Sequence, residues 1–146
     1  MDSVLMNKAS KPPIGVSRDA TVIAAVRLMA SKRVGALLVL EDGRAAGIFT
    51  ERDLMLKVVL EGRDPNSTLI ADVLTSPVTP IRDDAALDEA VHLMLMRHIR
   101  HLPLVDREGR VLGMLSMRDL VEEEIDELKH SVDGLAAYAG YDGAGG

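Results

Sequence analysis

The sequence predicts an α+β fold built from two copies of one strand–helix–strand–strand–helix unit. Residues 47–54 and 113–120 share one pattern, which runs Gly, two apolar residues, a hydroxyl residue, one variable residue and then Arg-Asp-Leu. Matches continue in order through the flanking sequence, as Asp19 with Asp84, at an offset of 65 positions that becomes 66 after the inserted Glu108. A repeat is sought first because missing it changes the whole fold assignment. We therefore expect two related units in one molecule.

The first helix of each unit is predicted by apolar residues at helical spacing. These residues lie within 22–29 of the first unit and 87–94 of the second. A period near 3.6 residues is typical of a helix with one buried face. Asp19 and Asp84 precede the two segments, and carboxylates suit a helix N-terminus both as caps and through the dipole. We expect these aspartates to cap the two helices.

A hairpin is predicted after each of these helices. Short apolar runs bounded by charged residues and Gly are typical of buried strands. The turns contain Gly, which supplies a positive φ. In chain order the strand, the turn and the return strand are expected at residues 36–40, 41–44 and 45–49, and again at 102–105, 106–110 and 111–115.

A second helix of each unit starts within the shared pattern. Thr50 and Ser116 are expected as N-caps, which places Asp53 and Asp119 in the first helical turn. In the second unit this helix is predicted to be long and to run to residue 138, with an acidic start.

The composition limits the classes of function. The chain has 146 residues, of which 47% are hydrophobic, and this suits one ordinary domain or two small units that share a core. A net charge of −6 and a content of only three aromatic residues argue against nucleic-acid binding. The sequence has no Cys, so we expect no disulfides and a reducing, cytoplasmic location. No apolar run is long enough for a signal peptide or a membrane span.

The repeated hydroxyl and carboxylate form a candidate ligand site. A helix N-terminus favours an anion through its free N–H groups and its dipole. The hydroxyl of Thr50 or Ser116 is expected to donate to a phosphate oxygen, and the carboxylate of Asp53 or Asp119 to accept from a vicinal diol. A ribose phosphate presents both groups. The alternative is an ordinary capped helix start, but the repetition of the whole pattern favours a ligand site in at least one unit.

Neighbouring residues extend this candidate site. Gly47 and Gly113 are expected to let a ligand approach the backbone closely. Arg52 and Arg118 are permanent cations directly before the aspartates, which makes them candidates for phosphate contacts. An Arg beside an Asp is also commonly a weak surface ion pair.

A second concentration of polar residues precedes the apolar strand of the second unit. It includes His98, Arg100 and His101, whereas the first unit has Gly35 and Ala36 at the positions of the last two. Phosphate binding is therefore a candidate role in the second unit only. Two His residues without Cys or an obvious carboxylate make a weak metal site, and no metal is expected. For His98, a cation at the C-terminal end of a helix dipole is an equally good interpretation.

No catalytic constellation is evident. The sequence has no Cys nucleophile and no His with an assignable Ser and Asp partner. Asp83 and Asp84 are adjacent at a helix start rather than facing each other across a site. We therefore expect a protein that is not an enzyme.

With these motifs in view, the chain resembles a tandem pair of CBS domains, also called a Bateman module. The resemblance rests on residues 47–53 and 113–119 and on the run 98–106, and it covers residues 10–125. Since little is left for a catalytic or channel domain, the chain is similar to the stand-alone bacterial CBS-pair proteins. The resemblance implies two β-α-β-β-α repeats packed through their sheets about a pseudo-two-fold axis, with two clefts between them.

The resemblance also implies a ligand class. Such clefts bind adenosyl compounds, of which AMP or ATP is expected here first and NAD or S-adenosylmethionine next, with no further cofactor required. The aspartates would bind ribose, the hydroxyls phosphate or ribose, and apolar residues the adenine. The expected ligand-binding residues are Val16, Gly47, Ile48, Thr50, Arg52, Asp53, Ile81, Arg100, His101, Pro103, Gly113, Met114, Ser116, Arg118 and Asp119.

The two clefts are expected to differ. If phosphate-binding cations come from the opposite repeat, Arg100 and His101 complete the cleft of Asp53, while the cleft of Asp119 receives none. The resemblance therefore predicts tighter binding of a phosphorylated ligand at Asp53.

The expected organisation is a first repeat over residues 1–65, a second over 66–125 and a C-terminal extension over 126–146. A surface loop is expected at 62–68 and a frayed tail at 140–146. The expected function is a regulatory sensor that signals to an unknown protein through its conformation or its homodimer. The alternative is a non-catalytic scaffold or dimerisation module with vestigial clefts.

Overall fold

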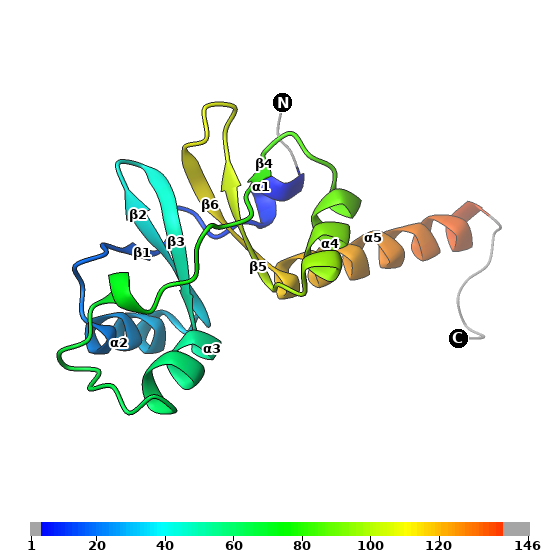
Figure 1. Ribbon diagram of the computed structural model, residues 1–146. Helices are drawn as coiled ribbons and strands as arrows, with labels where there is room; N and C mark the ends of the chain where they lie inside the picture. Colours follow the sequence, from blue (N-terminus) through cyan, green and yellow to red (C-terminus); the bar gives the residue numbers. More distant parts are fainter. Residues whose placement is uncertain (1–3, 139–146) are drawn as a thin grey trace.

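The computed structural model of the chain describes residues 4–138, with side chains as far as residue 134. The tail expected at 140–146 lies outside the described residues. The chain forms two lobes of similar design, each with a three-stranded sheet toward the centre of the molecule and helices on its outer side (Figure 1). This arrangement confirms the predicted α+β fold of two repeats packed through their sheets.

The first lobe follows the predicted order of elements. Its elements are β1 (Gly15–Val16), α2 (Val22–Lys32), β2 (Ala36–Glu41), β3 (Arg44–Thr50), the short helix α3 (Glu51–Asp53) and the π-helix η1 (Leu54–Val59). Strand β1 pairs with β2 in parallel across the α2 connection, and β2 and β3 form an antiparallel hairpin. The last residue of β3, Thr50, pairs with Ala36, so the motif begins at the end of the sheet.

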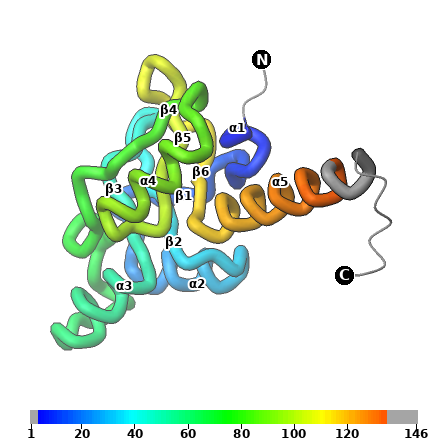
Figure 2. Tube along the Cα trace, turned by 90° about the vertical axis from the view of Figure 1, so that its right-hand side faces the viewer, coloured from blue at the N-terminus to red at the C-terminus, as the bar shows by residue number. Residues whose placement is uncertain are grey.

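The second lobe repeats this topology. Its elements are β4 (Ile81–Arg82), α4 (Leu87–Arg97), β5 (His101–Val105), β6 (Val111–Ser116) and α5 (Met117–Tyr138). Ser116 pairs with His101 at the position that corresponds to the Thr50–Ala36 pair. Both predicted hairpin turns are confirmed, since Gly43 and Gly109 have φ of 77° and 84°. The long helix predicted to end at residue 138 is also confirmed as α5, which projects away from the body in both views (Figures 1 and 2).

The prediction that Asp19 and Asp84 cap the first helices is wrong. Helix α2 is capped by the Thr21 hydroxyl, and α4 follows Ala86, which offers no side-chain bond. The aspartates lie two positions earlier, in turns, where Asp84 forms an exposed ion pair with Arg82 at 3.0 Å. A carboxylate in the turn before a helix is too far from the free N–H groups of its first turn to cap them.

The N-terminal segment packs on the second lobe. Helix α1 (Val4–Lys8) places Leu5 in the second core, where it is fully buried, and Ala9 follows it. Ser10 then joins β6 through two backbone hydrogen bonds with Met114, of 2.9 and 3.2 Å. Figure 1 shows α1 in the lobe of β4–β6, although the chain continues from it into β1 of the other lobe.

The linker between the repeats makes the reciprocal contact with the first lobe. The 3₁₀ turn η2 (Ile70–Asp72) places Ile70 in the first core together with Val73. Thr75 pairs with Ile48 of β3 through backbone hydrogen bonds of 2.8 and 2.9 Å. The division of the sequence at residue 65 stays a prediction, and the packing crosses it in both directions.

A central apolar cluster joins the two sheets. Along β2, Leu37 and Val39 face the helices of the first lobe, while Ala36 and Leu38 face the other sheet. The cluster consists of Ala36, Leu38 and Met114, with Leu40, Ala45, Ile48 and Val111 packed against it. The two lobes therefore share buried surface and hold the two motifs in fixed relation. Within the described residues, no helix combines the length and apolar character needed to cross a bilayer.

Candidate functional site

The repeated motif forms the same capped helix start in both lobes. The Thr50 hydroxyl accepts a hydrogen bond from the Asp53 N–H (3.1 Å), and the Asp53 carboxylate accepts one from the Thr50 N–H (3.0 Å). Ser116 and Asp119 make the same two bonds, at 3.1 and 3.0 Å. The predicted N-caps are confirmed, and Asp takes the part that Glu or Gln usually has in a capping box.

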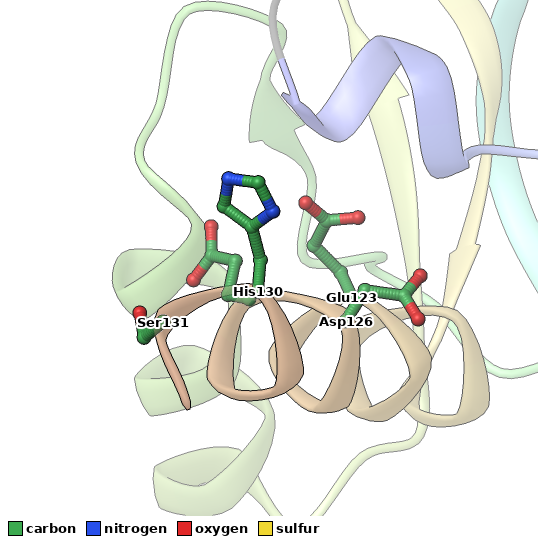
Figure 3. Close-up of a pocket in the computed structure, with 5 residues that line it drawn as sticks. Glu123, Asp126, His130 and Ser131 are labelled. Carbon is green, nitrogen blue, oxygen red and sulfur yellow. The ribbon is translucent and has the colours of Figure 1, made fainter. Parts of the chain in front are cut away.

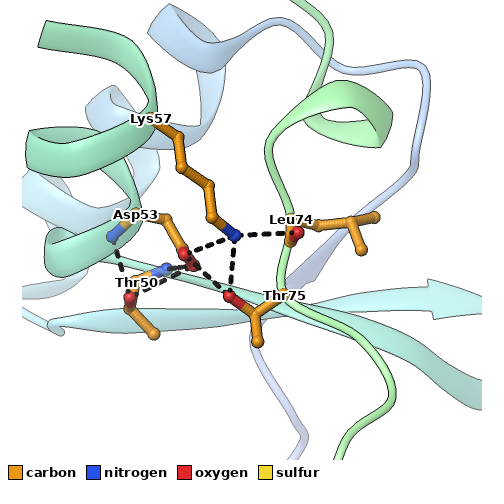
Figure 4. A network of polar contacts seen from close by, with 5 residues as sticks. All are labelled: Thr50, Asp53, Lys57, Leu74 and Thr75. Atoms are coloured by element: carbon orange, nitrogen blue, oxygen red, sulfur yellow. Dashed lines mark hydrogen bonds and ion pairs between the residues drawn. The ribbon is translucent and has the colours of Figure 1, made fainter. Parts of the chain in front are cut away.

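The Asp53 carboxylate has further partners that enclose it (Figure 4). The residue is only 5% exposed. Its Oδ1 accepts from the Thr75 hydroxyl at 2.7 Å and lies 3.0 Å from Lys57 Nζ, while Oδ2 also accepts from Thr50 Oγ1 at 3.2 Å. Lys57 Nζ donates in addition to the Leu74 carbonyl and the Thr75 hydroxyl. A carboxylate has about four acceptor sites, and here they are all in use.

The Asp119 carboxylate is much less engaged. Its Oδ2 accepts from the Ser116 N–H, and among the described residues its Oδ1 has no hydrogen-bond partner. Asp119 is only partly buried. Glu123 stands at the position that corresponds to Lys57, and its partner is Lys8 at 3.3 Å. The second motif therefore keeps a free acceptor where the first has none.

The two motif glycines are explained by contacts of the chain with itself. A Cβ on Gly47 would lie 2.8 Å from the Leu74 side chain and 2.9 Å from the Thr75 carbonyl oxygen. A Cβ on Gly113 would lie 2.7 Å from the carbonyl oxygen of Ser10. The crossing segments therefore explain why both positions are glycine, and the close approach of a ligand to this backbone stays a prediction.

The two motif arginines point toward solvent. Arg118 Nε pairs with Glu122 at 3.2 Å, and the Arg118 side chain is 87% exposed. Arg52 is exposed and has no ion pair with another described residue. Arg118 thus forms a weak surface ion pair with Glu122 rather than with the adjacent Asp119, and its contact with a phosphate stays a prediction.

The imidazole of His101 interacts electrostatically with one carboxylate from each motif. Burial lowers the pKa of its imidazole, and the negative charges of Asp119 and Glu51 oppose that effect, while Arg100 adds to it. Asp119 belongs to the same repeat as His101, and Glu51 follows Thr50 in the other. Arg100 is exposed. The charge of Glu51 acts on His101 across the repeats, and the expectation that Arg100 and His101 complete the Asp53 cleft stays a prediction.

His98 has a structural role. It is the C-cap residue of α4, in the left-handed region with φ of 55°, and its N–H donates to the carbonyl of Met94. This agrees with its interpretation as a helix end. Among the described residues, no three His, Cys, Asp or Glu side chains cluster in a way that could hold a metal ion.

The apolar candidates divide between the cores and the centre of the molecule. Val16 packs against the first core and Ile81 belongs to the second. Ile48 and Met114 lie in the central cluster, and buried Pro103 pairs with Met114. Strand alternation places these three on the same face as the motif hydroxyls. They are therefore better placed than Val16 and Ile81 to contact a ligand at the motifs.

A hollow on the described surface lies along α5 and begins one helical turn after the second motif (Figure 3). Its lining is acidic and consists of Glu123, Asp126, Glu127, His130 and Ser131. Lys8 of α1 pairs with two of these carboxylates, at 3.3 and 3.6 Å. Such a lining repels phosphate, so this hollow is no candidate for a nucleotide.

Two residues of the polar network escaped the sequence analysis. Lys57 lies four residues after Asp53, which is ion-pair spacing on a helix, and this signal was visible. Thr75 is 22 residues from Asp53. Only the return of the linker to β3 brings it to the motif, and no local pattern predicts that return.

Comparison with known proteins agrees with the repeat. The family model for the CBS domain matches residues 4–60 and 70–126. An uncharacterized protein of Methanopyrus kandleri is 33% identical over 117 residues, which are 80% of this chain and 60% of that protein. The chain thus spans less than two thirds of the length of this relative.

Solved structures share the fold. A CBS-domain protein from Burkholderia ambifaria is 36% identical with a TM-score of 0.77, and the match covers 85% of this chain and 94% of that one. The CBS domain protein PAE2072 from Pyrobaculum aerophilum, solved in complex with AMP, is 25% identical with a TM-score of 0.72, over 79% of this chain and 88% of that one. With its duplicated motif, its two sheets and these matches, the chain belongs to the CBS domain family and contains two CBS domains in tandem.

Proposed function

We propose that the protein is a regulatory module that binds an adenosyl nucleotide, AMP or ATP in the first place or a related compound such as NAD, between its two CBS domains. The observation that carries this proposal is the second motif, where the proton of a hydroxyl and one carboxylate oxygen are free of partners among the described residues, at the N-terminus of α5. The complex of PAE2072 with AMP supports the ligand class, because that protein shares the fold over most of this chain.

The chemistry of the motif suits a ribose phosphate. The Asp119 Oδ1 atom accepts hydrogen bonds and suits a ribose hydroxyl, and the Ser116 hydroxyl can donate to a phosphate. The dipole of α5 favours the anion at this end of the helix. Binding would signal through a change in conformation or in a homodimer that another protein reads. S-adenosylmethionine is the remaining member of the expected ligand class.

A scaffold without ligand is the second candidate function. The polar network around Asp53 favours this function, because there the motif connects β3, η1 and the linker through hydrogen bonds and an ion pair. In that case both motifs would be structural, and the acidic face of α5 would be the functional surface.

Thermal unfolding in the presence of AMP, ATP, NAD and S-adenosylmethionine separates the two functions. A ligand that binds only the folded chain stabilises it by about 2.7 kcal/mol at a concentration of about 100 times its Kd. We expect at least one of the four to raise the midpoint in proportion to the logarithm of its concentration. Adenine-free ribose 5-phosphate is the matched control. No shift with any compound would leave the scaffold as the function.

A further inference from the structure

The two motifs carry opposite charges one helical turn beyond the aspartate. Lys57 follows Asp53 by four residues, and Glu123 follows Asp119 by four. Lys57 is close enough to bond to Asp53, at 3.0 Å. Glu123 has the same charge as Asp119, and its ion-pair partner is Lys8 of α1, at 3.3 Å. Motifs that look equivalent in sequence therefore differ in electrostatics.

The crossing segment adds to this difference. Thr75 and Ser10 hold corresponding places, since each pairs through its backbone with the strand that leads into a motif. The Thr75 hydroxyl donates to Asp53 at 2.7 Å. The Ser10 hydroxyl makes no hydrogen bond to a described residue. A ribose diol could reach the Asp53 carboxylate only by breaking bonds that are already made, whereas Asp119 Oδ1 is free.

The second motif also has a hydrogen-bond donor that is free for a phosphate. Its hydroxyl proton is uncommitted, because the Ser116 Oγ atom only accepts, whereas Thr50 Oγ1 donates to Asp53. His101 pairs with Ser116 across the strands and feels the charge of Asp119. An imidazole at this place can donate a hydrogen bond to an anion.

We propose that the chain binds one adenosyl ligand, at the Asp119 motif, and that Lys57 gives the Asp53 motif a purely structural role. This inference rests on the proposed function and names its site. It reverses the preference for Asp53 that the resemblance implied. Lys57 is the residue that sets the preference.

Calorimetric titration of the full chain with AMP tests the assignment. We expect one AMP per chain. Asp119→Asn is expected to weaken binding by about tenfold or more, since a hydrogen bond to a charged group is lost. Asp53→Asn is expected to keep an affinity close to wild type. For stability without ligand, we expect the opposite order of effects. Asp53→Asn disrupts a buried network and lowers the midpoint of thermal unfolding, while Asp119→Asn has little effect.

A charge exchange makes the test sharper. Glu123→Lys places a cation four residues after Asp119, as Lys57 is after Asp53, and is expected to abolish AMP binding. Glu127→Lys makes the same change of charge one turn further along α5 and is expected to leave binding intact. Lys57→Met releases Asp53 and is expected to add a second, weaker site.

The outcomes are distinguishable. Two equivalent AMP sites in the wild type, or a larger loss from Asp53→Asn than from Asp119→Asn, would overturn this inference and leave the proposed function standing. A wild type that binds none of AMP, ATP, NAD and S-adenosylmethionine would overturn both. Circular dichroism checks that each variant is folded. If Asp53→Asn does not fold, Thr75→Val tests the same network, and Ser116→Ala is the second variant at the other motif.

Discussion

Asp53 and Asp119 occupy the same position in the repeat, and their neighbours determine what each can do. Asp53 has a cation and a hydroxyl on Oδ1 and is 5% exposed. Asp119 has a free oxygen and a carboxylate, Glu123, one turn away. The backbone capping bonds are the same in both, so the difference lies mainly in residues outside the motif, together with the extra bond from the Thr50 hydroxyl to Asp53.

His101 is expected to make the free energy of unfolding depend on pH. Burial holds the folded-state pKa of its imidazole below the ordinary value of 6.5. As the pH falls through 6.5, the unfolded chain takes up this proton before the folded chain does. The free energy of unfolding therefore falls with decreasing pH below about 6.5, and His101 makes no such contribution above it.

The variant His101→Gln isolates this contribution. Urea unfolding at a series of pH values from 5 to 8 is expected to give a flatter profile for the variant than for the wild type below about pH 6.5. Equal slopes in that range would contradict a lowered pKa. The profiles should run parallel at the alkaline end, where the imidazole is neutral in both states.

At the scale of elements, the sequence predicts correctly the features that depend on contacts between residues close together in the chain. The Gly-containing turns and the hydroxyls before α3 and α5 act within a few residues, and they were predicted correctly. The caps of α2 and α4 were misplaced because Asp19 and Asp84 are acidic but lie too early. Both crossing segments were missed, since Leu5 and Ile70 find their cores far away in sequence. The linker segment bonds to the first motif through Thr75, and the N-terminal segment pairs with β6, which leads into the second motif.

The contact of the N-terminal segment with β6 predicts an unequal effect of two glycine substitutions. Gly113→Ala brings a methyl group to 2.7 Å from the Ser10 carbonyl oxygen. We expect this change to destabilise the fold by about 1–3 kcal/mol, as overpacking does. Gly134→Ala in α5 meets nothing within 4 Å. There the better helix propensity of Ala stabilises by up to about 1 kcal/mol. Urea unfolding measures both, and similar effects of the two changes would contradict the close approach at Gly113.

At the scale of the whole molecule, each lobe is completed by a segment from outside its own repeat. Helix α1 closes the second core and η2 the first, while the central cluster ties the sheets together. Helix α5 leaves this body as a projecting arm (Figure 2). A ligand at the Asp119 motif would sit at the base of that arm, so its binding is placed to change how the arm is oriented or paired.

The arm carries an apolar stripe that suits a second copy of this chain. Val121, Ile125, Leu128 and Val132 follow the alternating four- and three-residue spacing of a coiled coil, and their exposed fractions are 47%, 56%, 66% and 62%. Glu124 and Lys129 flank the stripe at positions that oppose each other across a parallel pair, where opposite charges attract. This complementarity supports the proposed homodimer, with the two α5 helices side by side and parallel.

Disrupting the stripe is therefore expected to separate the protomers. Leu128→Asp places a charge at the centre of the proposed contact, and sedimentation velocity should show a shift from dimer to monomer. The control variant Glu127→Gln changes the neighbouring residue, which lines the acidic hollow instead of the stripe, and the dimer should persist. Lys129→Glu removes the attraction to Glu124 and should weaken the dimer less than Leu128→Asp does, because exposed ion pairs contribute about 1 kcal/mol or less. A monomeric wild type, or a Leu128→Asp variant that remains dimeric, would show that α5 does not pair in this way.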